Sequence, residues 1–149
     1  MEDFLNKKIV FIDDQVLMRE YFEGFAAFYG FKNIHIYPSV ESFVREHTKL
    51  EMLSDIDLLL TDHHLGEGKT DGYMLSYRLR GFGLKFPIII ISADTLVDFS
   101  LFTNQTLIKP FAIETLMEAI CKQLHFVNES INDSRRDKPD DLDFMKDIH

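Results

Sequence analysis

The chain has 149 residues, of which 46% are hydrophobic and 13% aromatic, so it suits one domain with a substantial core. Acidic residues outnumber basic residues 25 to 16, and the resulting charge of −9 repels phosphate backbones, which argues against nucleic acid as a partner. The single cysteine, Cys121, excludes a disulfide framework. The longest aliphatic run, Ile88 to Ile91, is far shorter than the ~20 residues that cross a bilayer. Composition therefore predicts a cytoplasmic protein without a membrane partner.

Short apolar strands alternate with amphipathic helices in the first third of the chain. The elements predicted there are a strand at residues 8–12, a helix at 18–29, a strand at 33–37 and a helix at 40–47. Gly30 is typical of a helix C-terminus, and Ser39 is typical of an N-cap. The aromatic residues of the first helix, among them Phe22, Phe25 and Phe28, recur at three- and four-residue steps, so we expect them in the core.

The same alternation continues through the rest of the predicted domain. The further elements are a strand at residues 56–61, a helix beginning at 71, strands at 88–91 and 106–108, and a helix at 113–124. Three of the five strands are continuous aliphatic runs, which is typical of parallel strands covered on both faces. The predicted fold class is therefore α/β, a doubly wound five-stranded parallel sheet with helices on both faces.

The composition changes near residue 128. Residues 1–127 are predicted to form the domain, and residues 128–149 an acidic, flexible C-terminal tail. An alternative is a short docking segment, because Leu142, Met145 and Ile148 could share one face of a helix.

Polar residues end four of the predicted strands. They are Asp13 with Asp14, Asp62, Ser92 and Lys109. In open α/β sheets the ligand site lies beyond the carboxyl ends of the strands, so these side chains should meet at one rim. Three close carboxylates repel one another unless a cation lies among them, and Mg²⁺ prefers such oxygen ligands. With an ammonium and a hydroxyl added, the set suits a phosphoryl group, with the carboxylate of Asp62 as a covalent acceptor.

Four short motifs, found in order at these strand ends, resemble the response-regulator receiver domain of bacterial two-component signalling. They are IVFIDDQVLMR, LLLTDHHL, IIIISAD and LIKPF, and the resemblance extends from residue 8 to about residue 125. It implies a flavodoxin-like fold, Mg²⁺ as cofactor, and phosphorylation of Asp62 by a histidine kinase or a phosphotransfer protein.

The resemblance also implies roles for individual residues at the metal site. Asp62 corresponds to the phosphoacceptor and is itself a metal ligand. Asp14 corresponds to the acid that binds Mg²⁺ directly, and Asp13 to the acid that usually acts through a water molecule. The backbone carbonyl of His64 corresponds to a further metal contact. As zinc ligands His63 and His64 are disfavoured, because adjacent histidines on a loop point in different directions.

The remaining roles concern the phosphoryl group itself. Ser92 corresponds to the switch hydroxyl that turns toward the phosphoryl group, and Lys109 to the lysine that binds it. The resemblance further implies a cis peptide bond between Lys109 and Pro110.

The chain departs from the family pattern beside the last two strands. Thr106 stands where the family usually has an aromatic partner of the switch hydroxyl, and the stretch from Ser92 to Lys109 is several residues shorter than usual. We therefore expect the helix in this stretch to be a single turn or irregular. We expect the signal to leave through residues 92–106, where an apolar surface is supplied by Leu96, Val97, Phe99, Leu101 and Phe102.

These observations predict a stand-alone receiver without an output domain, which catalyses only its own phosphorylation and dephosphorylation. A downstream protein or a second copy of the chain would be its further partner. One alternative is a pseudo-receiver, an interaction module that is not regulated by phosphorylation. Another is a Mg²⁺-dependent phosphatase with an aspartyl nucleophile, which usually carries an acid at the place of His64.

Overall fold

Five parallel strands form a single sheet in the order β2-β1-β3-β4-β5. The computed structural model describes the backbone of residues 2–136 and the side chains of residues 3–125. The strands are β1 (Ile9–Ile12), β2 (Ile34–Tyr37), β3 (Leu58–Asp62), β4 (Ile88–Ser92) and β5 (Gln105–Ile108). The predicted fold class is confirmed, and each predicted strand lies within two residues of the observed one.

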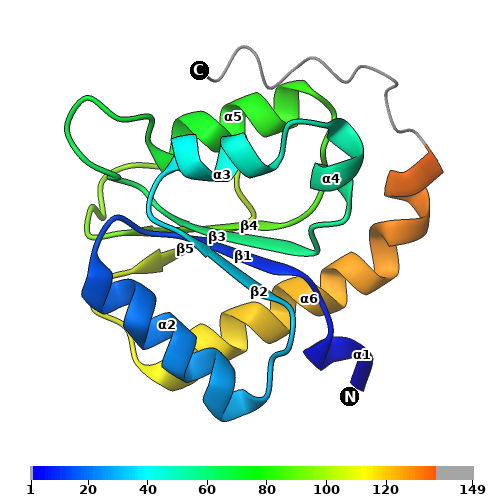
Figure 1. Cartoon of the computed structure of the whole chain (residues 1–149), viewed down its shortest axis with the longest axis horizontal. Helices are drawn as coiled ribbons and strands as arrows, with labels where there is room; N and C mark the ends of the chain where they lie inside the picture. The colour runs from blue at the N-terminus through cyan, green and yellow to red at the C-terminus, as the bar shows by residue number, and fades with distance from the viewer. Residues whose placement is uncertain (1, 137–149) are drawn as a thin grey trace.

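Helices cover both faces of the sheet (Figure 1). They are α1 (Glu2–Leu5), α2 (Val16–Tyr29), α3 (Val40–Glu46), α4 (Leu50–Ser54), α5 (Gly72–Gly81) and α6 (Ile113–Arg136). In Figure 1, α3, α4 and α5 lie on one side of the sheet, and α2 and α6 lie on the other. Residues of β1 alternate between the two cores, because neighbouring side chains of a strand point to opposite faces: Val10 and Ile12 pack toward α3 and α5, Ile9 and Phe11 toward α2 and α6.

The predicted helix boundaries rest on local capping. Gly30 ends α2 with φ of +85°, a conformation that glycine adopts without a steric penalty, and its N–H donates to the carbonyls of Ala26 and Ala27. Ser39 caps α3 in a reciprocal pair with Ser42. One expectation for α2 is wrong: Phe22 and Phe25 are buried, but Phe28 is 78% exposed.

The sequence analysis missed two short helices. The N-terminal helix α1 has only four residues, too few for a periodic pattern. The helix α4 has five residues and buries Leu50 and Leu53 against the sheet, so its stability comes from packing rather than from a local signal.

The last helix contains the predicted helix 113–124 and continues to Arg136. The predicted acidic tail, residues 128–149, lies beyond the residues whose side chains the structure describes, so it stays a prediction. Among the described residues, no helix has the length and hydropathy needed to cross a membrane.

Residues 93–104, all of which the structure describes, connect β4 to β5 without a helix, as the short stretch predicted. Local side-chain turns shape this segment, since Asp94 Oδ1 accepts a hydrogen bond from the N–H of Leu96 and Asp98 Oδ1 from that of Ser100. The expectation of an entirely exposed apolar segment is wrong in one respect. Phe99 is only 1% exposed, because it packs beneath the segment, whereas Leu96 is 94% exposed.

The far end of this segment is fixed by Arg80 of α5. Its guanidinium donates to the carbonyl of Phe102 and to the side chain of Asn104, at 3.1 and 2.8 Å, and to the carbonyls of Leu84 and Phe86. Burial lowers the pKa of Arg80 to about 10. Arg80 therefore joins the end of the segment to the loop that precedes β4.

Candidate functional site

The carboxyl end of β1 supplies two aspartates with different environments. Asp13 is fully buried, and its Oδ1 accepts a hydrogen bond of 2.9 Å from the N–H of Gln15. Its other oxygen, Oδ2, is also buried and has no hydrogen-bond partner among the described residues. Asp14 is exposed at the mouth of the site. The carboxyl end of β1 therefore presents one buried, hydrogen-bonded carboxylate, Asp13, and one exposed carboxylate, Asp14.

The central strand β3 ends at Asp62, which is 5% exposed. Lys109, directly after β5, reaches across with its Nζ 2.7 Å from Asp62 Oδ1. The peptide bond between Lys109 and Pro110 is cis, as the resemblance implied. One oxygen of Asp62 is thus paired with a cation, while the other is not part of this ion pair.

Ser92 ends β4 and is 2% exposed. Its Oγ accepts a hydrogen bond of 2.9 Å from the N–H of Asp94. Because the hydroxyl acts here as an acceptor, its own hydrogen stays available for donation to a bound group.

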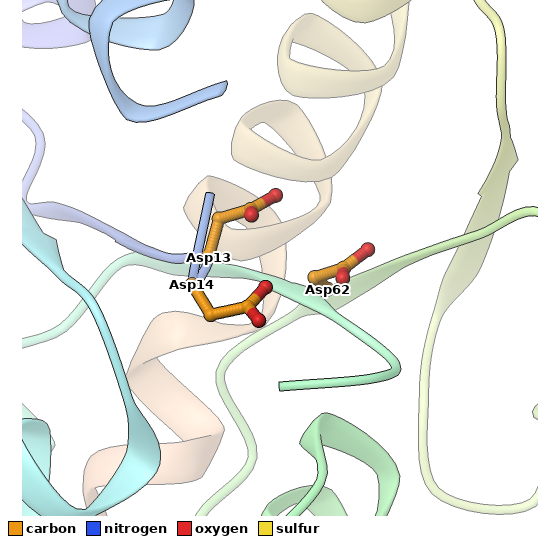
Figure 2. A group of neighbouring side chains, drawn as sticks. All are labelled: Asp13, Asp14 and Asp62. Carbon is orange, nitrogen blue, oxygen red and sulfur yellow. The ribbon is translucent and has the colours of Figure 1, made fainter. Parts of the chain in front are cut away.

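Figure 2 shows the carboxyl groups of Asp13, Asp14 and Asp62 side by side. One carboxylate oxygen of each lies within 4.8 Å of those of the other two. Burial raises the pKa of Asp13 to about 6, with the negative charge of Asp62 adding to the effect and the Gln15 hydrogen bond opposing it. Burial also raises the pKa of Asp62, against the influence of Lys109. The cluster therefore holds excess negative charge.

This donor set fits a hard divalent cation. Mg²⁺ takes oxygen ligands and usually binds through one or two carboxylates plus phosphate oxygens and water. The buried Oδ2 of Asp13 has no partner within the part of the chain that the structure describes, which is costly unless a cation or an ordered water molecule satisfies it. The residues present therefore match the predicted metal.

A cavity of about 420 Å³ opens above these side chains. Three predicted phosphorylation residues line it, namely Asp62, Ser92 and Lys109, and so do Asp14 and His64. Among the described residues the structure thus brings every predicted site residue to one rim of the sheet, with Asp13 in the adjoining carboxylate cluster.

The sequence analysis did not assign two neighbours of the acceptor to the site. His63 lines the cavity, and its ring lies 4.1 Å from that of His64 and 4.7 Å from that of Phe99. Burial lowers its pKa. No local pattern signals this position, because the contact joins residues 36 positions apart in the sequence.

Gly72, the other missed residue, begins α5 directly against the acceptor strand. Its N–H donates to the carbonyl of His63 at 3.0 Å. A Cβ at this position would overlap the Asp62 carbonyl oxygen and lie 2.6 Å from Thr61 Oγ1. Only glycine therefore lets α5 approach the end of β3 this closely.

The doubly wound parallel sheet, with polar residues at its strand ends and an ion-paired aspartate at their centre, defines the chain as an α/β domain with a polar site at the carboxyl edge of the sheet. Residues 9–121 match the response regulator receiver domain family, so the chain belongs to this family. A comparison with curated proteins finds no match.

Solved receiver domains share the fold. A CheY-like response regulator receiver domain protein from Methanospirillum hungatei JF-1 has a TM-score of 0.66 at 19% identity, covering 84% of this chain and 98% of that one. A response regulator receiver domain protein from Clostridium thermocellum has a TM-score of 0.69 at 18% identity, with coverages of 82% and 97%. The signal receiver domain of an HD domain-containing protein from Pseudomonas fluorescens Pf-5 has a TM-score of 0.68 at 17% identity, with coverages of 83% and 98%.

Proposed function

We propose that this chain is a cytoplasmic, phosphorylation-dependent receiver that takes a phosphoryl group from a histidine kinase or a phosphotransfer protein onto Asp62. The observation that carries the proposal is the position of Asp62. It lies at the centre of the rim, ion-paired with Lys109 at 2.7 Å and clustered with Asp13 and Asp14.

In the proposed transfer, a carboxylate oxygen of Asp62 attacks the phosphorus of a phosphohistidine on the donor protein. A P–O bond to Asp62 forms, and the P–N bond of the donor breaks. The leaving imidazole keeps the electron pair and takes a proton from solvent. Hydrolysis then removes the phosphoryl group: water attacks phosphorus, the P–O bond to Asp62 breaks, and the protons of the water leave with the phosphate. Inorganic phosphate is released and the Asp62 carboxylate is restored.

In this proposal, each polar side chain beside Asp62 interacts with the phosphoryl group or with Mg²⁺. The ammonium of Lys109 neutralises charge on a phosphoryl oxygen, and the hydroxyl of Ser92 donates a hydrogen bond to another. Asp13 and Asp14, with the backbone carbonyl of His64 and Asp62 itself, would hold Mg²⁺. When bound, this ion offsets the negative charge of the carboxylates and of the phosphoryl oxygens.

Mass spectrometry of the full chain after incubation with acetyl phosphate and Mg²⁺ tests the proposal. We expect an adduct of roughly 80 Da, the mass of one phosphoryl group, in the wild-type protein and none in Asp62→Asn. Asp55→Asn, an exposed aspartate outside the cluster, is the matched control and should form the adduct.

The two alternative functions give different results in the same experiment. A pseudo-receiver would form no adduct, and a phosphatase would instead hydrolyse many phosphoesters with repeated turnover. Either result would contradict the proposal.

A further inference from the structure

His63 borders two parts of the molecule at once. One side of the residue lines the cavity above Asp62. Its ring also meets the ring of Phe99 at an interplanar angle of 67°, with centroids 4.7 Å apart, which is a favourable edge-to-face contact. Because Phe99 is 1% exposed, it is the buried anchor of the segment 93–104. A single side chain thus connects the site to this segment.

The ring contacts continue from Phe99 to the surface of α5. Phe99 packs edge-on against Tyr73, with centroids 5.2 Å apart, and Tyr73 contacts Phe102 at 5.5 Å. Phe102 in turn meets Tyr77, which is 49% exposed, at 5.1 Å. A displacement of Phe99 would therefore shift the rings of Tyr73, Phe102 and Tyr77 and so change the outer surface formed by α5 and residues 93–104.

Hydrogen bonds hold the backbone of His63, whereas Nδ1 of its ring makes none with the described residues. The N–H of His63 donates to the carbonyl of Ile91 at 2.8 Å, and its carbonyl accepts from the N–H of Gly72 at 3.0 Å. By contrast, Nδ1 of the ring is buried and has no hydrogen-bond partner among the described residues. A buried polar atom without a partner gains free energy from any new hydrogen bond. The ring therefore has an unused hydrogen-bonding atom beside the cavity, while the backbone hydrogen bonds hold the strand end in place.

The aromatic residue that the family usually has three positions before the lysine is replaced here by Thr106, which has no ring to move. The contacts of His63 offer another connection between the site and residues 93–104.

We propose that His63 is a positioning residue that couples occupation of the Asp62 site to the conformation of residues 93–104. An oxyanion or its ordered water molecule in the cavity gives Nδ1 a partner, and the ring turns. The edge contact with Phe99 then changes, and so does the surface around Phe102 and Tyr77. This inference rests on the proposed function, since it assigns a response to the same site.

Amide hydrogen exchange on the full chain tests the inference, with and without Mg²⁺ and beryllofluoride as the phosphoryl mimic. Occupancy is followed independently by fluorine NMR, so that all variants are compared when saturated. In the wild-type protein we expect several-fold slower exchange across residues 93–104 on saturation. In His63→Ala we expect this response to be lost.

Two further variants distinguish coupling from simple destabilisation. His63→Phe keeps a ring against Phe99 but lacks Nδ1, so its resting exchange should match the wild-type protein while its response is lost. His35→Ala, which removes another half-buried histidine from the opposite edge of the sheet, should respond like the wild-type protein.

The outcomes separate the two proposals. Bound beryllofluoride with unchanged exchange at residues 93–104, or a full response in His63→Ala or His63→Phe, would overturn the inference alone. A wild-type protein that binds no beryllofluoride would overturn the proposed function and the inference with it.

Discussion

The strand ends around Asp62 and the segment 93–104 are held in place by different interactions. At the strand ends, the hydrogen-bonded ladders of β1, β3 and β4 fix the backbone, and the side chains are charged and crowded. The segment has no such ladder, and Phe99 is its one fully buried ring. Repulsion between charges is thus concentrated at the strand ends, whereas individual side-chain contacts and turns, rather than a strand ladder, order the segment.

The largest expected effect comes from removing the anchor of the segment. Phe99→Ala should lower the free energy of unfolding by about 4 kcal/mol, because it deletes a fully buried ring and leaves a cavity. Leu101→Ala, in the same segment but 77% exposed, should change it by less than about 0.5 kcal/mol. Urea denaturation measures both. Similar losses in the two variants would show that the segment does not depend on one anchor.

The second prediction concerns the close approach of α5 to the end of β3 at Gly72. Gly72→Ala should cost about 3 kcal/mol, because the new Cβ meets the backbone of Asp62, which cannot move without breaking the ladder. Gly24→Ala, in the exposed middle of α2 with no atom within 4 Å of the new Cβ, should gain about 1 kcal/mol. The same urea experiment compares them. An unchanged free energy of unfolding in Gly72→Ala would show that the end of β3 can move to accommodate the new Cβ.

The charge stored at the strand ends predicts a pH dependence in metal-free protein. The pKa of Asp13 is about 6 in the folded chain and near 3.8 when unfolded, so between these values the folded chain binds more protons. Stability should therefore fall as pH rises from about 4 to 7, by at most about 3 kcal/mol more than in Asp13→Asn. Thermal unfolding in chelator across this range measures the difference, which saturating Mg²⁺ should remove. Parallel curves for the two proteins would refute the assignment of the slope to Asp13.

The smallest effect concerns the exposed member of the cluster. Asp14→Asn should abolish Mg²⁺ binding, measured by calorimetry, yet raise the melting temperature in chelator by about 2 °C, because repulsion with Asp13 and Asp62 is relieved. Solvent screens this exposed group, so the gain is modest. Asp55→Asn serves as the control and should leave both quantities unchanged. A lower melting temperature for Asp14→Asn in chelator would contradict stored repulsion at the site.

The sequence predicted the first of the two regions well and the second poorly. Four of the five strands stop at polar residues, so Asp13, Asp62, Ser92 and Lys109 are marked by local signals, and the parallel sheet brings them together. The absence of a regular helix between β4 and β5 was also predictable from the short stretch. Nothing local distinguishes the buried Phe99 from its exposed neighbours, because its burial depends on where His63 and Tyr73 lie in the folded chain.

The segment 93–104 is fastened at three separated points: Asp94 to the Ser92 hydroxyl, Phe99 beneath it, and Asn104 to Arg80. Several side chains of the segment, such as Leu96 and Leu101, face solvent and contribute little to folding. Evolution can therefore replace them at little risk to the sheet or to the chemistry of the strand ends. The outer face of this segment can therefore diverge by a handful of substitutions while the residues at the strand ends stay the same.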